Sequence, residues 1–324
     1  MKSPNPSICI LDAFTTNPGD LSWEALASLG NLTVYDRTSP SERLERAEGH
    51  HILITNKVVL DKGLLCQVPD CELVCLLSTG TNAVDLDYCR ERGIPVCNIP
   101  AYSTDSVAEL TFALLLDWAR GVHVHGEAVR EGAWCDSADF CFSKTPQREL
   151  AGKTLGLVGF GEIARAVARI AAAFGMKLLA CTPHPEGKPE MGQDFVTLET
   201  LLAESDVVSL HCPLTEATQG LINEDRIAMM RPGAVLINTG RGGLLDEAAV
   251  AAALKEGVLG AALLDVLSSE PPRADNPLLS APNCTITPHI AWATRAARER
   301  LISILVENVT AFLEGNPKNV VNPA

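Results

Sequence analysis

The sequence predicts an α/β fold with two doubly wound parallel sheets. Short apolar segments alternate with helical patterns along most of the chain, which is typical of parallel strands joined by helical crossovers. The length of 324 residues is enough for about two domains. A third observation is a glycine-rich turn, residues 159–164, between an apolar strand and an alanine-rich helix. This is the context that a dinucleotide site requires, so one sheet is predicted to bind a dinucleotide.

The first hundred residues contain the strands expected for one sheet. These strands are expected at residues 8–12, 32–35, 51–55, 73–77 and 95–98, with helices near 22–29 and 85–92. Two polar segments, Asn56-Lys57 and Ser78-Thr79-Gly80, follow strands here. Ligands bind at the carboxyl ends of parallel strands, so both segments are candidate ligand contacts.

A long buried helix is expected at residues 104–120, where apolar side chains recur at helical spacing. Residues 121–150 show weak periodicity and mixed aromatic residues. We interpret them as an excursion that could form an inter-subunit arm. His123 and His125 lie in it, and two isolated histidines do not predict a metal site.

The glycine-rich turn is the strongest single motif. A strand at 154–158 leads into Gly159-Phe160-Gly161-Glu162-Ile163-Ala164, and a helix and a strand at 176–181 follow. Gly159 permits the tight turn, Gly161 lets the backbone approach a pyrophosphate, and Ala164 replaces the third glycine. The helix N-terminus offers N–H groups to the phosphates. Thr182 stands where an acid usually contacts the adenine ribose.

Four more strands are expected in the second half of the chain, at 206–210, 234–238, 261–265 and 284–287. Each ends in polar or small residues, as the lining of a cofactor cleft would. A final helix is expected at 294–314, closed by Gly315.

Composition limits the partners. A net charge of −14 argues against nucleic acid and anionic membranes, and no apolar run is long enough to span a bilayer. The chain leads directly into its first strand, so no signal peptide is expected. The 11 cysteines are scattered without a C-x-x-C pair, which favours reduced thiols, no metal and a cytoplasmic location.

Several ordered motifs make the chain resemble a known family. They are residues 78–85, 96–104, 238–243 (Asn-Thr-Gly-Arg-Gly-Gly), 265–271 (Asp-Val-Leu-Ser-Ser-Glu-Pro) and 287–294 (Thr-Pro-His-Ile-Ala-Trp-Ala-Thr). From about residue 55 to 323 the chain resembles the D-isomer-specific 2-hydroxyacid dehydrogenases, most of all their glycerate dehydrogenase (hydroxypyruvate reductase) branch. The resemblance implies hydride transfer between a nicotinamide cofactor and C2 of a small D-2-hydroxy or 2-oxo acid.

The resemblance also implies an architecture. A Rossmann NAD-binding domain, residues 102–287, would be inserted into a flavodoxin-like substrate domain formed by residues 1–101 and 288–324. It further implies a homodimer that buries the helix 104–120 and the arm that follows it.

Three catalytic residues follow from the matched motifs. By resemblance, Arg241 binds the substrate carboxylate and stabilises the developing oxyanion, which suits arginine's planar fork. His289 exchanges the proton with the C2 oxygen. Glu270 hydrogen-bonds the other imidazole nitrogen.

The resemblance supplies the remaining contacts. The cofactor contacts are Thr104, Gly159, Phe160, Gly161, Glu162, Ile163, Thr182, Cys212, Pro213, Thr218, Thr239, Gly240, Asp265 and Ala291. The substrate contacts are Ser78, Thr79, Gly80, Arg241, His289 and Trp292. NAD(H) is the expected cofactor, and NADP(H) is possible because Thr182 removes the carboxylate that repels a 2′-phosphate, with His184 and Lys188 nearby in sequence.

The expected substrate is hydroxypyruvate, reduced to D-glycerate. A backbone loop, Ser78-Thr79-Gly80, together with one arginine suits a monoacid, and Asn56 and Lys57 could hydrogen-bond a C3 hydroxyl. Glyoxylate and pyruvate remain alternatives. An NAD-sensing, corepressor-like binding protein is a third reading, because it would keep the same Arg241, Glu270 and His289.

Overall fold

The computed structural model describes residues 5–185 and 192–323. Residues 1–4, which the prediction about a signal peptide concerned, lie outside the described part. So does Lys188, which was named in the prediction of cofactor choice. The chain divides into two compact units. Unit 1 consists of residues 1–103 and 293–324, and unit 2 of residues 104–292. The cofactor domain was expected at residues 102–287, so its first boundary was placed two residues too early and its last boundary five residues too early. His289 therefore belongs to unit 2.

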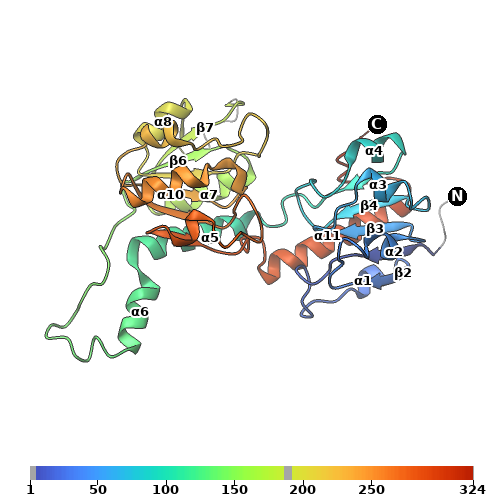
Figure 1. The fold of residues 1–324 in the computed structure, drawn as a ribbon, viewed down its shortest axis with the longest axis horizontal. Coiled ribbons are helices and arrows are strands. Elements are labelled where there is room, and N and C mark those ends of the chain that lie inside the picture. Colours follow the sequence, from blue (N-terminus) through green and yellow to red (C-terminus); the bar gives the residue numbers. More distant parts are fainter. Residues whose placement is uncertain (1–4, 186–191, 324) are drawn as a thin grey trace. The chain divides into compact units, whose positions relative to one another are not determined.

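Unit 1 is built on a five-stranded parallel sheet (Figure 1). Its strands are β1 (Ser7–Ile10), β2 (Asn31–Val34), β3 (Ile52–Thr55), β4 (Leu73–Leu76) and β5 (Val96–Cys97). The strand order, β2-β1-β3-β4-β5, is the flavodoxin-like one. The helices are α1 (Glu24–Ala27), α2 (Arg43–Ala47), α3 (Lys62–Leu65), α4 (Leu86–Glu91) and the returning α11 (Arg295–Leu313).

Unit 2 is built on a seven-stranded parallel sheet. Its strands are β6 (Thr154–Val158), β7 (Lys177–Cys181), β8 (Asp194–Phe195), β9 (Val207–Leu210), β10 (Ala234–Asn238), β11 (Leu259–Leu264) and β12 (Cys284–Ile286). The order β12-β11-β10-β9-β6-β7-β8 is the doubly wound Rossmann order with one extra edge strand, and it reverses direction beside β6. The turn after β6 therefore lies at the switch point, where such sheets bind ligands.

Helices cover both faces of the unit-2 sheet. On one face the apolar sides of α5 (Thr104–Arg120) and α7 (Glu162–Ala173) share a buried cluster with strand residues such as Leu157 and Ile237. On the other face α8 (Leu198–Glu204), α9 (Glu224–Ala228) and α10 (Glu247–Lys255) do the same. Two short 3-10 helices, η1 (Gly242–Leu244) and η2 (Pro277–Ser280), complete the unit. The predicted fold class is confirmed.

The segment after α5 contains a helix that the sequence analysis did not predict. Residues Val122–Arg130 form α6, which projects with the loop after it away from the rest of unit 2 (Figure 1). Gly121 lies between α5 and α6 with φ +56°, so the chain changes direction there. Helix α6 is short and has a glycine, Gly126, in its interior, so helical propensity over this segment is low.

Among the helices that the structure describes, none is long and apolar enough to cross a membrane.

Candidate active site

The three predicted catalytic residues follow three neighbouring strands. Arg241, Glu270 and His289 come after β10, β11 and β12, which lie side by side in the unit-2 sheet. The register pairs Asn238 with Leu264 and Leu264 with Ile286, so these strands end in line. Their loops therefore start from the same edge of the sheet.

His289 is bound to Glu270. The imidazole Nδ1 lies 2.6 Å from Glu270 Oε2, and the two side chains are 28% and 35% exposed. The other carboxylate oxygen, Oε1, accepts the Leu267 N–H at 3.2 Å. Because Nδ1 faces the carboxylate, Nε2 is the nitrogen that a ligand can reach. His289 also has φ +54°, a conformation that non-glycine residues adopt mainly where the surrounding structure enforces it.

Asp265 fixes the His289 segment. This aspartate is 1% exposed, and its carboxylate accepts the Thr287 hydroxyl and the Ile290 N–H on Oδ1 and the Ala291 N–H on Oδ2, at 2.5, 2.9 and 2.8 Å. Its backbone carbonyl accepts the His289 N–H at 2.8 Å. These bonds hold residues 287–291 and account for the unusual φ of His289.

A buried asparagine shapes the Arg241 turn. Asn238 is fully buried; its Oδ1 accepts the Gly240 N–H at 3.1 Å and its Nδ2 donates to the Arg241 carbonyl at 2.9 Å. The Arg241 side chain is exposed, with Nη1 donating to the Gly240 carbonyl at 2.8 Å. The guanidinium is thus presented on a rigid turn.

Gly242 links that turn to the Glu270 loop. A Cβ at Gly242 would lie 1.9 Å from the Leu267 carbonyl carbon and 2.3 Å from the Ser268 nitrogen. Only glycine permits the backbone of one loop to approach the other this closely. Leu267 in turn donates to Glu270, so the positions of the three predicted catalytic residues depend on one another.

The glycine-rich turn has the geometry of a phosphate cradle. Gly159 has φ +89°, and a Cβ there would lie 2.7 Å from the Cys212 nitrogen. Gly161 is different, because a Cβ there would meet no atom within 4 Å, which leaves open space beside its backbone. Helix α7 begins at Glu162 with no side-chain cap, so its first N–H groups are available to an anion. These residues fit a dinucleotide pyrophosphate.

The other predicted cofactor contacts all lie in unit 2. Thr182 directly follows β7 and is half-buried, and Phe160 packs edge-on against Phe195 at 5.5 Å. Thr218 Oγ1 accepts the Thr215 N–H and donates to the Pro213 carbonyl, which closes that turn. The rest of the set is Thr104, Cys212, Thr239, Gly240 and Ala291; Thr239 and Ala291 are buried.

A half-buried histidine lies behind the glycine turn. His211 follows β9, and its carbonyl carbon would lie 2.7 Å from a Cβ at Gly159. The ring Nε2 is 2.9 Å from Ser209 Oγ, and desolvation by the surrounding protein lowers the pKa of His211 to about 4. The ring is therefore neutral at neutral pH.

The predicted carboxylate loop, Ser78-Thr79-Gly80, belongs to unit 1. Ser78 Oγ donates to the Gly80 carbonyl at 2.7 Å, and Thr79 Oγ1 donates to the Ile99 carbonyl at 2.8 Å. Asn98 Nδ2 donates to the Thr79 carbonyl at 2.8 Å. Within the part of the chain that the structure describes, the N–H groups of Thr79 and Gly80 donate to no protein acceptor. The loop can thus present two N–H donors to a ligand. The remaining predicted substrate contact, Trp292, is the last residue of unit 2.

The neighbouring segment Asn56-Lys57 is held by Asp12. The Asp12 carboxylate accepts the N–H groups of Asn56, Lys57 and Val58 at 2.8, 2.6 and 3.2 Å, and the Thr55 hydroxyl at 3.1 Å. The Asn56 amide is 7% exposed and donates to Thr15 Oγ1. Of the two side chains proposed for a C3 hydroxyl, only Lys57 is exposed.

Three site residues escaped the sequence analysis. Asp12 and Asn238 follow or end apolar strands, where such residues commonly fold onto backbone N–H groups, so this position was the available signal. Gly242 lies in a matched motif, but its role could not be predicted because its contact partner, Leu267, is 25 residues away in sequence. Among the described residues no group of three or more His, Cys, Asp or Glu side chains could hold a metal.

Comparison with known proteins identifies the family. Residues 112–291 match the family model for the NAD binding domain of D-isomer specific 2-hydroxyacid dehydrogenases. A hydroxypyruvate reductase from Blautia hydrogenotrophica is 44% identical over 97% of this chain and 99% of its own length. A glyoxylate reductase from Thermococcus litoralis is 40% identical over 87% of this chain and 85% of its own length. The crystal structure of the TT0316 protein from Thermus thermophilus superposes with a TM-score of 0.86 at 38% identity, covering 97% and 99% of the two chains.

The chain belongs to the D-isomer specific 2-hydroxyacid dehydrogenase family. It is an NAD(P)-dependent oxidoreductase that acts on a small 2-hydroxy or 2-oxo acid.

Proposed function

We propose that the enzyme reduces hydroxypyruvate to D-glycerate, with NAD(H) as its preferred cofactor. The observation that carries the chemistry is the 2.6 Å contact between His289 Nδ1 and Glu270, which directs Nε2 toward a ligand. The substrate assignment rests on the resemblance to hydroxypyruvate reductases, including the relative at 44% identity.

Each residue has a role in this proposal. The N–H groups of Thr79 and Gly80 and the fork of Arg241 bind the substrate carboxylate. The turn 159–163 would hold the pyrophosphate of a nicotinamide cofactor, which when bound would supply the hydride to C2. His289 Nε2 gives its proton to the C2 oxygen while Glu270 holds the ring, and Arg241 stabilises the negative charge that develops on that oxygen. In oxidation the proton returns to His289.

Asp265 is proposed to contact the nicotinamide carboxamide as well as to fix the His289 segment. A carboxylate offers about four acceptor positions, and the chain uses three of them. One position, on Oδ2, therefore remains for an amide N–H.

A turnover assay tests the substrate. Initial rates of NADH oxidation with hydroxypyruvate, glyoxylate and pyruvate should give a kcat/KM for hydroxypyruvate that exceeds that for pyruvate by at least about 10²-fold, because a site that bonds a hydroxyl rejects the analogue lacking it. Lys57→Met should reduce this ratio. Comparable efficiency with pyruvate would exclude the hydroxypyruvate assignment, and a preference for glyoxylate would match the relative at 40% identity instead.

The proposal includes a homodimer and a cytoplasmic location. The arm of unit 2 exposes four large apolar side chains: Val122 (67%), Val129 (41%), Trp134 (53%) and Phe140 (91%). A second copy of the chain could bury them. Sedimentation at micromolar concentration should find a dimer, and a monomer would refute this part. The eleven free cysteines suit a reducing compartment.

A further inference from the structure

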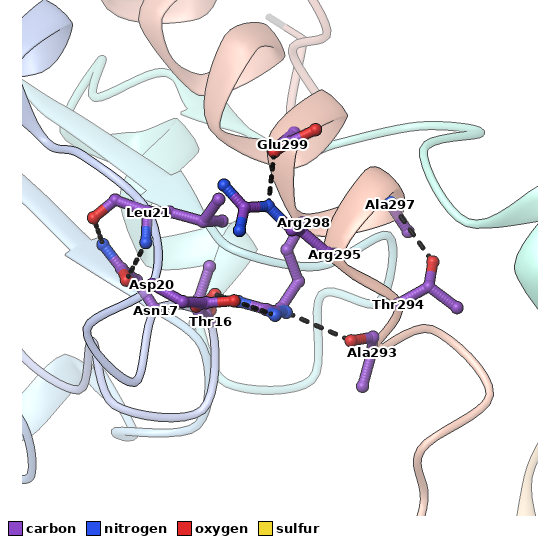
Figure 2. Close-up of polar contacts among 10 residues, drawn as sticks. All are labelled: Thr16, Asn17, Asp20, Leu21, Ala293, Thr294, Arg295, Ala297, Arg298 and Glu299. Carbon is purple, nitrogen blue, oxygen red and sulfur yellow. Dashed lines mark hydrogen bonds and ion pairs between the residues drawn. The ribbon is translucent and has the colours of Figure 1, made fainter.

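One buried arginine of unit 1 makes four polar contacts at the start of α11 (Figure 2). Arg298 is 8% exposed. Its two terminal nitrogens pair with the two oxygens of Asp20, each at 2.7 Å, and Nη1 also donates to the Thr16 carbonyl at 3.2 Å. Its Nε donates to the Ala293 carbonyl at 3.1 Å. A fork with fixed geometry therefore joins Ala293 to the loop that follows β1.

The Asp20 side of this contact set is itself rigid. Asn17 Oδ1 accepts the Leu21 N–H, and its Nδ2 donates to the Leu21 carbonyl at 2.7 Å (Figure 2). Asn17 Oδ1 also accepts the Gly19 N–H at 3.1 Å. These bonds close the loop around Asp20. The hydrogen bonds from Arg298 lower the pKa of Asp20, so the pair stays ionised below the usual range of an aspartate.

Ala293 is the first residue after Trp292, and the residue before Trp292 is also fixed. The Ala291 N–H donates to Asp265 at 2.8 Å, and its carbonyl accepts the Ser106 hydroxyl at 2.5 Å, both within unit 2. Trp292 thus stands between two backbone positions that are each held by a buried side chain. The chain also passes from unit 1 to unit 2 at residues 103–104. Near that crossing, Arg300 Nε donates to the Tyr102 carbonyl at 2.8 Å, as Arg298 does to the Ala293 carbonyl.

We propose that Arg298 is a positioning residue: by holding the Ala293 carbonyl it fixes the backbone of Trp292 and so the fit of the 2-oxo acid. The inference rests on the proposed function, in which Trp292 borders the substrate. Ser106 performs the same task from the other side of Trp292. His289 is positioned separately by Asp265 and Glu270, so Arg298 governs substrate binding and leaves proton transfer to those residues.

The test compares two arginines of the same helix. Arg298→Lys keeps the charge but cannot reach Asp20 and Ala293 together, and it should raise the KM of the 2-oxo acid about tenfold with kcat within about threefold, since it weakens substrate binding alone. The NADH dissociation constant, measured by fluorescence titration, should not change. The control is Arg295→Lys, because the Arg295 side chain is 65% exposed and pairs with Glu299, so its KM should equal that of wild type (Figure 2).

Two further variants separate positioning from simple stability. Asp20→Asn removes the ion pair but leaves the bond to Ala293, so it should lower the melting temperature and keep KM within about threefold. Ser106→Ala, a small change that should fold even if Arg298 variants do not, should raise KM without weakening NADH binding. In a Trp292→Ala background, Arg298→Lys should add no further rise in KM, since the two act as a unit.

Several outcomes would overturn the inference. One is an Arg298→Lys enzyme with wild-type KM. Another is an Asp20→Asn enzyme whose KM rises as much as that of Arg298→Lys, because the loop would then matter and the Ala293 carbonyl would not. A Ser106→Ala enzyme with unchanged KM would also count against it. The proposed function fails differently, through a wild-type enzyme without turnover of hydroxypyruvate; the KM comparison would then use the 2-oxo acid that the enzyme does reduce.

Discussion

The two units contain the same device at a strand end, with different consequences. In unit 1, Asp12 follows β1 and accepts bonds from the segment after the neighbouring strand β3. In unit 2, Asp265 follows β11 and accepts bonds from the segment after the neighbouring strand β12. Both carboxylates thereby fix a segment that the sequence analysis had predicted to contact ligands.

The difference lies in the number of acceptor positions that the chain uses. Asp12 accepts four bonds, which fills a carboxylate, whereas Asp265 accepts three. Asp12 is thus fully committed to its own unit, and Asp265 can still accept a donor from a ligand. The segment that Asp265 fixes also contains His289, whereas the segment that Asp12 fixes has one exposed side chain, Lys57. The remaining acceptor capacity is what distinguishes Asp265 as a candidate ligand contact from Asp12.

The largest effect should come from the segment that Asp265 fixes. His289→Ala should lower kcat by about 10²–10⁴-fold, because the reaction loses its positioned proton donor. Lys57→Met, in the segment that Asp12 fixes, is the matched control and should leave kcat within about threefold while changing the substrate preference. Steady-state initial rates of NADH oxidation give kcat for both variants and the substrate preference of Lys57→Met. A His289→Ala enzyme with near wild-type kcat would show that the proton donor is elsewhere.

The next test compares the two aspartates directly. Asp265→Asn places an amide where three N–H and O–H donors converge, so it should lower kcat/KM by about 10²-fold, equivalent to about 2.7 kcal/mol. It should also weaken NADH binding. Asp12→Asn should instead lower the urea midpoint without weakening NADH binding, because Asp12 holds only unit 1. Equal NADH affinity in wild type and Asp265→Asn would remove the proposed carboxamide contact.

The substrate arginine tests whether the rigid turn matters. Arg241→Lys should raise KM and lower kcat, with a loss in kcat/KM of about 10-fold or more, since lysine lacks the bidentate fork. Gly242→Ala is the companion change. Its Cβ would overlap the Leu267 carbonyl carbon, so the variant should lose activity with Arg241 intact. An unchanged kcat/KM in Arg241→Lys would contradict the assigned role.

The sequence predicted most of the fold because its strands are short, apolar and bounded by turn residues. The bounds of α5, β6 and β10 were predicted to the residue. The sequence failed where long-range contacts decide. Helix α6 is short and contains Gly126, so the sequence did not reveal it. The role of Gly242 depends on a loop that follows another strand. The Asn56 amide, expected at the substrate, also donates to Thr15 Oγ1, a contact 41 residues away that the sequence could not show.

A strand end without a carboxylate extends the comparison to cofactor choice. Thr182 follows β7, where relatives with an acid would repel a 2′-phosphate. Wild type should therefore accept NADPH with reduced but measurable efficiency, and Thr182→Asp should increase the ratio of NADH to NADPH kcat/KM by about tenfold. Complete rejection of NADPH by wild type would show that other residues set the preference.

The smallest effect concerns His211. This residue directly follows β9, as Asp265 follows β11, but its side chain is a neutral imidazole and not a carboxylate. Its folded-state pKa of about 4 lies below the ordinary value of about 6.5, so the unfolded chain binds a proton first as the pH falls. Stability is then retained above about pH 6.5 and lost as the pH falls toward 4. With its ring partly exposed, His211 should make the free energy of unfolding about 1 kcal/mol lower at pH 5 than at pH 7. His211→Gln, which can still bond Ser209, should flatten this part of the profile in urea titrations, and an equal slope in both proteins would show that other groups cause it.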